Sequence, residues 1–140
     1  MLKKKLVKIL VKSYDKRYIK LETRLASFAR RVLWFLNKKD KNLFVFLITQ
    51  KESLRLNKEY RKIDKVASVL SFEKKEDFPG DKELLGEIYI TPSVLKSKGY
   101  TLQLVTVHGI LHLLGFNHEK LKETSLMENL EAEVLRRVDF

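Results

Sequence analysis

The chain of 140 residues contains no cysteine, which excludes disulfide bonds and every metal site built on thiolates. Imidazole and carboxylate groups are therefore the strong metal ligands that remain. Long apolar runs are also missing, because the longest fall well short of a membrane span. The opening MLKKKLVKILVK lacks the long apolar region and the cleavage site of a signal peptide. We therefore expect one compact cytoplasmic domain with no membrane contact.

Acidic residues are scarce in the first 40 positions, where 13 lysines and arginines stand against 3 aspartates and glutamates. Residues 41–140 are nearly balanced, with 16 basic and 15 acidic side chains. Almost all of the net charge of +11 thus comes from one segment. A basic surface favours a polyanionic partner such as nucleic acid, through steering and counterion release. Lysines that only keep the protein soluble, or a surface adapted to heat, would give the same composition.

Apolar periodicity predicts strands and helices mixed along the whole chain. The run LFVFLIT at residues 43–49 predicts a strand buried on both faces. Thr49 with Glu52 fits a capping box, and Thr101 is expected to cap an apolar helix that ends at Gly115. Further strands are expected at residues 2–11, 68–72 and 86–91, and further helices at 18–36, 92–98 and 122–138.

All three histidines lie within the segment HGILHLLGFNH. His108 and His112 are four residues apart, so a helix places both imidazoles on one face, where they can bind one ion. Gly115 can turn the chain back and bring His118 round as a third ligand. Three protein ligands leave a fourth position for water, as in catalytic zinc sites. Burial of two imidazoles in an apolar helix also needs compensation, which a metal ion supplies. The alternative is that these are ordinary histidines satisfied by hydrogen bonds.

This spacing is that of the metzincin zinc site, His-Glu-x-x-His-x-x-Gly-x-x-His, with one difference. Gly109 stands where those proteases have a glutamate as general base. A peptidase that relies on this glutamate is therefore disfavoured. A base could come from elsewhere in the protein, or the substrate could supply its own nucleophile.

The same segment resembles the YbeY-type metal-dependent endoribonucleases, whose signature is approximately H-G-x-L-H-L-x-G-[YF]-D-H. Asn117 replaces the aspartate of that signature. The upstream stretch LNKEYRKID, from Leu56 to Asp64, and the later stretches VLSF and LGEIYI are also similar. The family's Pro-Thr-Asp/Asn stretch is Val66-Ala67-Ser68 here. The resemblance covers about half of the chain.

The resemblance implies a zinc-dependent endoribonuclease that prefers single-stranded RNA and binds one zinc ion per chain. It implies that the protein acts in 3′-end maturation of small-subunit (16S) ribosomal RNA and in ribosome quality control. The expected partners are ribosomal RNA and the small ribosomal subunit, with no DNA. The implied architecture is α+β, a mixed, mostly parallel four-stranded sheet with about five helices and a zincin-like metal helix. Residues 1–140 would form one such metallohydrolase domain.

The metal ligands expected are His108, His112 and His118, with His108 also serving catalysis. Arg61 matches the family's functional arginine, and a guanidinium suits the negative charge that builds up during phosphodiester cleavage. The sequence alone slightly favours a helix-end arginine that complements the dipole, and the family match favours the functional role.

Weaker candidates remain open beside these residues. Glu87, Tyr89 and Glu119 are candidates for orienting a ligand or relaying a proton. Ser71 and Phe72 are candidates for RNA contact, Phe72 by stacking on a base, although core packing is the favoured role for Phe72.

Two other functions remain open. A ribosome assembly factor could bind RNA and use zinc for structure, without hydrolysis. A metal hydrolase could instead act on another substrate, such as a peptide. Chelation separates structural from catalytic zinc, because a structural site loses the fold and a catalytic site loses activity first.

Overall fold

A computed structural model describes residues 7–74, 83–116 and 121–140, with the side chains of 121–123 left aside. Within these ranges the chain forms four strands, four α-helices and three short 3-10 helices, where about five helices were expected. The strands are β1 (Ile9–Ser13), β2 (Asn42–Leu47), β3 (Val69–Glu73) and β4 (Leu84–Ile90). The α-helices are α1 (Glu22–Phe35), α2 (Gln50–Arg61), α3 (Leu102–Leu113) and α4 (Leu121–Arg137), and the 3-10 helices are η1 (Lys16–Leu21), η2 (Pro92–Val94) and η3 (Lys96–Lys98).

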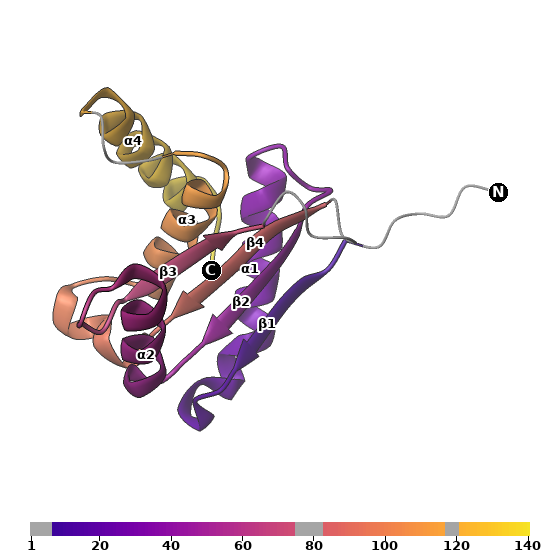
Figure 1. Cartoon of the computed structure of the whole chain (residues 1–140). Coiled ribbons are helices and arrows are strands. Elements are labelled where there is room, and N and C mark those ends of the chain that lie inside the picture. The colour runs from indigo at the N-terminus through magenta and orange to yellow at the C-terminus, as the bar shows by residue number, and fades with distance from the viewer. Residues whose placement is uncertain (1–6, 75–82, 117–120) are drawn as a thin grey trace.

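The strands form one sheet in the order β1-β2-β4-β3. β1, β2 and β4 run parallel, whereas β3 is antiparallel to β4 and forms an edge. In Figure 1, α1 and α3 lie on one face of this sheet, α4 packs against α3, and α2 lies on the other face. This is the mixed, mostly parallel sheet that the sequence predicts. No helix in the described part of the chain is long and apolar enough to cross a membrane.

The main core lies between the sheet and the layer of α1 and α3. Every second residue of β1 and β2 points into it, and Leu43, Val45 and Leu47 are fully buried. The prediction that β2 is buried on both faces is wrong, since Phe44 and Phe46 are only half-buried. The physical reason is that α2 covers a small second core, built on Ile48, Leu56 and Leu70, and leaves the rest of that face thinly covered.

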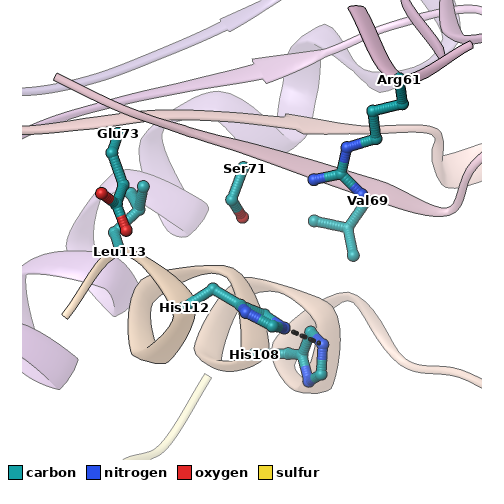
Figure 2. A pocket seen from close by; sticks show the side chains of 7 residues that line it. All are labelled: Arg61, Val69, Ser71, Glu73, His108, His112 and Leu113. Carbon is teal, nitrogen blue, oxygen red and sulfur yellow. Dashed lines mark hydrogen bonds between the residues drawn. The ribbon is translucent and has the colours of Figure 1, made fainter. Parts of the chain in front are cut away.

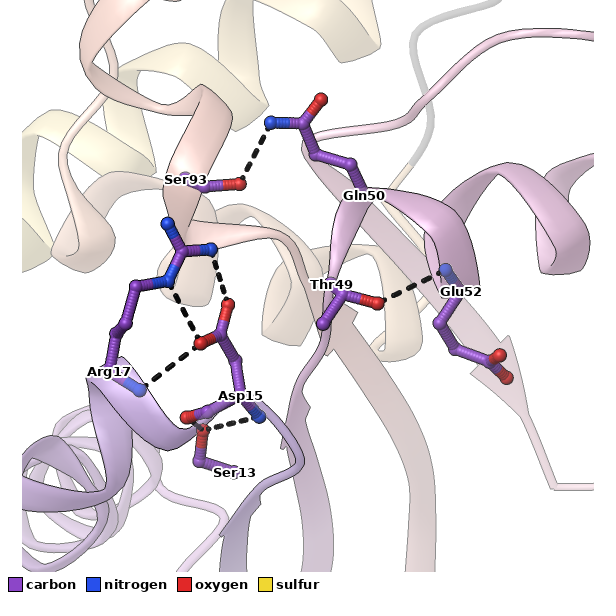
Figure 3. Close-up of polar contacts among 7 residues, drawn as sticks. All are labelled: Ser13, Asp15, Arg17, Thr49, Gln50, Glu52 and Ser93. Carbon is purple, nitrogen blue, oxygen red and sulfur yellow. Dashed lines mark hydrogen bonds and ion pairs between the residues drawn. The ribbon is translucent and has the colours of Figure 1, made fainter.

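Side-chain caps mark the starts of η1, α2 and α3, and two of them follow the sequence prediction. The Thr49 hydroxyl accepts a hydrogen bond from the Glu52 N–H, and the Thr101 hydroxyl accepts one from Leu104. Asp15 caps η1 in the same way and forms an ion pair with Arg17 at 2.7 Å, which lowers the pKa of its carboxyl group (Figure 3).

Several predicted boundaries differ from the structure. The first strand runs to Ser13 rather than Val11, and residues 1–6 lie outside the described part of the chain. The expected helix at 92–98 is two separate 3-10 turns, and the Thr91 hydroxyl donates to the Ala67 carbonyl instead of capping them. That bond ties the end of β4 to the start of β3, the strand that borders the site.

Candidate metal and phosphate site

The helix α3 carries His108 and His112 and lies directly on the sheet. It is apolar nearly all round, and most of its residues are buried. The two histidines are exceptions, half-buried on the side that faces β3 and α4. The helix thus offers its imidazoles at the border of the core, where a polar group needs a partner.

Gly109 lies where α3 packs tightly against the sheet. A Cβ atom at this position would lie 3.0 Å from both Cδ1 and Cγ2 of Ile88 and 3.2 Å from the Ser71 hydroxyl. Any side chain at this position would require the side chains of Ile88 and Ser71 to shift. The packing therefore gives a physical reason why this helix lacks the metzincin base at this position.

The two imidazoles point at one another. Their Nε2 atoms are 2.9 Å apart, and the rings meet edge to face at 4.5 Å between centroids. Two nitrogens bound tetrahedrally to one zinc at about 2.0–2.1 Å each lie roughly 3.3 Å apart, slightly farther than this pair. The pair therefore fits the first two ligands of a metal ion.

Gly115 ends α3 as predicted, with a φ of 101° that favours glycine. The N–H of Gly115 donates to the carbonyl of His112, which closes the last turn. The expected third ligand, His118, lies outside the described residues, as does Glu119. Within the described ranges no group of three or more metal-ligating side chains occurs, so the structure places two of the three expected ligands.

A cleft of about 200 Å³ opens above these histidines, between α3 and the edge strand β3. Figure 2 shows Arg61 extending from the end of α2 toward the imidazoles, with Ser71 between them. The structure thus brings together Arg61, His108 and His112, which the sequence separates by about 50 positions. The complete lining is Arg61, Val69, Ser71, Glu73, His108, His112 and Leu113.

Comparison with known proteins identifies the family of this chain. The model for "Endoribonuclease YbeY" matches residues 10–139. This chain belongs to the YbeY endoribonuclease family. An endoribonuclease YbeY from Legionella pneumophila is 38% identical over 130 residues, covering 84% of this chain and 78% of the relative. One from Ruthia magnifica is 33% identical over 122 residues, covering 81% and 84%.

A solved structure shows the same fold. The solution structure of a Thermotoga maritima protein superposes with a TM-score of 0.56 at 26% identity, covering 90% of this chain and 88% of that one. The family resemblance and the α+β architecture inferred from the sequence are therefore confirmed.

Arg61 of this YbeY chain reaches the cleft because of how α2 ends. Lys62 takes the left-handed conformation, and its N–H donates to the carbonyl of Asn57. The buried Asn57 side chain donates to the carbonyl of Lys65 at 2.8 Å and so holds the following loop. The last helical residue, Arg61, therefore lies beside β3, with its guanidinium past the edge of the sheet.

Three candidates from the sequence lie on the opposite face of the sheet from the histidines. Phe72 packs into the small core beneath α2, with ring centroids 5.6 Å from both Tyr60 and Tyr89. The Tyr89 hydroxyl donates to Glu87 at 2.7 Å, and burial together with this carboxylate raises the pKa of Tyr89. These residues do not line the cleft, whereas Ser71, on the other face of β3, does.

The structure adds Glu131, which the sequence analysis missed. Its carboxylate lies 2.7 Å from Nδ1 of His108, and the residue is 9% exposed. A carboxylate that accepts from Nδ1–H fixes the tautomer in which Nε2 carries the lone pair, an arrangement common among zinc histidines. The available signal was an acidic residue four positions after Met127 and three before Val134, on an otherwise apolar helix face.

Proposed function

We propose that this chain is a zinc-dependent endoribonuclease that cleaves single-stranded RNA in the cleft between α3 and β3. The observation that carries the proposal is the meeting of one guanidinium and two facing imidazoles in a single cleft. Membership of a family of endoribonucleases supports the reaction class. We further propose that residues 1–140 act as one metallohydrolase domain.

His108, His112 and His118 would hold one zinc ion, with Glu131 fixing the orientation and tautomer of His108. Bound zinc would polarise a phosphoryl oxygen and lower the pKa of a water molecule to about 7. The lack of cysteine is compatible with this donor set, because imidazole suits zinc without thiolate.

Arg61 would bind the scissile phosphate. Its guanidinium can donate two parallel hydrogen bonds to phosphate oxygens, and it stabilises the negative charge that grows on them in the transition state. Ser71, on the floor of the same cleft, offers a hydroxyl for a further hydrogen bond. Arg61 thus contributes both RNA binding and catalysis, while His108 contributes through the metal.

The substrate proposed is small-subunit ribosomal RNA, cut near its 3′ end, with the small subunit as partner in the cytoplasm. The uneven charge supports a polyanion, since residues 1–40 hold 13 of the 29 basic side chains and 3 of the 18 acidic ones. Several of these basic residues, including Lys8, Lys12 and Arg30, are exposed in the described structure.

The test is the variant Arg61→Ala. Loss of a charged donor to a transition state typically costs about 100-fold or more in turnover, so RNA cleavage should fall by about that factor. Zinc content should stay at the wild-type level, because Arg61 is not a proposed ligand. The matched control is Arg55→Ala on the same helix, whose side chain is paired with Glu52 and Glu59 and does not line the cleft. Wild-type turnover by Arg61→Ala would overturn the assignment.

A further inference from the structure

A second hollow adjoins the proposed reaction centre. It has a volume of about 320 Å³ and lies between the start of β3, the first turns of α3, and α4. Val69 and His108 line both this hollow and the Arg61 cleft. A strand of RNA with its phosphate at Arg61 and the imidazoles would therefore have a neighbouring nucleotide at this hollow.

The lining of the hollow suits a nucleobase rather than a phosphate. Tyr100 stands at it with 43% of its surface exposed, and Leu104 and Val105 provide apolar walls. Glu128 and Glu131 contribute two carboxylates, which repel a phosphate but accept hydrogen bonds from base amino groups. Aromatic rings are the usual platforms on which proteins stack single-stranded bases.

The main chain on both sides of Tyr100 is held in place. Gly99 takes a left-handed φ of 72° and ends η3, and the N–H of Tyr100 donates to the Leu95 carbonyl at 3.0 Å. The next residue, Thr101, caps α3. The Tyr100 ring is thus attached to a backbone that is fixed between the two caps, at Gly99 and Thr101. This reduces the entropy lost when a ligand binds.

Resting on the proposed nuclease function, we infer that this hollow is the binding site for the base of a nucleotide adjoining the scissile phosphate. Tyr100 stacks on that base, and Glu128 accepts a hydrogen bond from its exocyclic amino group. The site therefore gives the enzyme a preference for an amino-bearing base, such as cytosine or adenine, over uracil at one position of the RNA.

The experiment uses the zinc-loaded full chain and single-stranded RNA hexamers that carry one abasic nucleotide at each position in turn. Binding is followed by fluorescence anisotropy before cleavage sets in, and cleavage is followed on a gel. In the wild type, one abasic position should weaken binding by about 10- to 100-fold, the usual contribution of a stacked base. Tyr100→Ala should weaken binding of the intact hexamer by a similar factor.

The decisive comparison tests RNA with the abasic nucleotide against the Tyr100→Ala variant. The abasic position should cause no further loss in Tyr100→Ala, whereas Tyr100→Phe should behave like the wild type. Tyr14→Ala is the matched control, because Tyr14 is 62% exposed and lies just beyond β1, on the opposite edge of the sheet. In Glu128→Gln, the preference for cytosine over uracil at this position should shrink several-fold.

The site and the nuclease can fail separately. The base site would be overturned, and the nuclease left intact, if Tyr100→Ala bound and cleaved RNA like the wild type. The same follows if, at every abasic position, the loss of affinity in Tyr100→Ala adds fully to the loss caused by the abasic nucleotide. Position-specific binding without any cleavage by the wild type would overturn the nuclease and retain the base site. Binding of an extended peptide in preference to RNA would overturn both.

Discussion

At the scale of single residues, the site depends on how each imidazole is oriented. His108 is held between Glu131 at its Nδ1 atom and His112 at its Nε2 atom, with separations of 2.7 and 2.9 Å. A histidine so placed has one nitrogen committed to a carboxylate and the other turned toward the ion site. We therefore propose that Glu131 positions His108 as a metal ligand.

Glu131→Gln should weaken zinc affinity by about 10- to 100-fold, the usual cost of removing a carboxylate partner from a zinc histidine. The amide keeps the size of the side chain, so thermal unfolding of the metal-free protein should change little. Zinc titration by calorimetry measures the affinity.

The control for this prediction is Glu133→Gln, on the same helix. Glu133 forms an ion pair with Arg136 away from the cleft. The Glu133→Gln variant should bind zinc like the wild type. Equal zinc affinities in Glu131→Gln and Glu133→Gln would contradict the positioning role.

The sequence predicted His108 and His112 because they share a helix face, which depends only on local periodicity. Glu131 could not be predicted in this way, since its contact with His108 spans 23 positions and depends on how α4 packs against α3. Arg61 was chosen through family resemblance, because spacing alone does not show that α2 ends beside β3. Both the Glu131–His108 contact and the position of Arg61 beside β3 depend on packing between elements that are far apart in the sequence.

At the scale of elements, α3 is positioned by its close contact with the sheet. Gly109 lets α3 approach β4 until a Cβ atom would lie 3.0 Å from Ile88. The caps at Thr49 and Thr101 and the stop at Gly115 were predicted from local residue chemistry, and all three occur. The partial exposure of one face of β2 was not predicted, because its burial depends on where α2 packs.

Gly109→Ala should lower the free energy of unfolding by about 1 kcal/mol. Overpacking costs about 1–3 kcal/mol, and this outweighs the gain of about 1 kcal/mol from replacing glycine within a helix. Urea denaturation of metal-free protein measures the change.

Ile88→Val provides the internal control, because it removes Cδ1, one of the two Ile88 atoms that would lie 3.0 Å from the new Cβ atom. The double variant should therefore lose less stability than the sum of the two single losses. A Gly109→Ala protein that is more stable than the wild type would contradict the close contact.

At the scale of the whole molecule, the basic N-terminal third is joined to the C-terminal end of the chain. Arg24 donates to the main-chain oxygen of Phe140 at 3.0 Å, and Arg31 donates to that of Asp139. The ring of Phe140 lies against both Arg24 and the buried Phe28. Part of the basic charge predicted for an RNA surface therefore also fastens α1 to the end of α4.

The central claim is that the histidines hold a metal ion that cleaves RNA in the Arg61 cleft. The most direct measurement combines metal analysis of the purified protein with cleavage of single- and double-stranded RNA, for the wild type and His112→Ala. The account predicts one zinc per wild-type chain, cleavage mainly of the single strand, and loss of both zinc and cleavage in His112→Ala. Undiminished cleavage by zinc-free His112→Ala would contradict it.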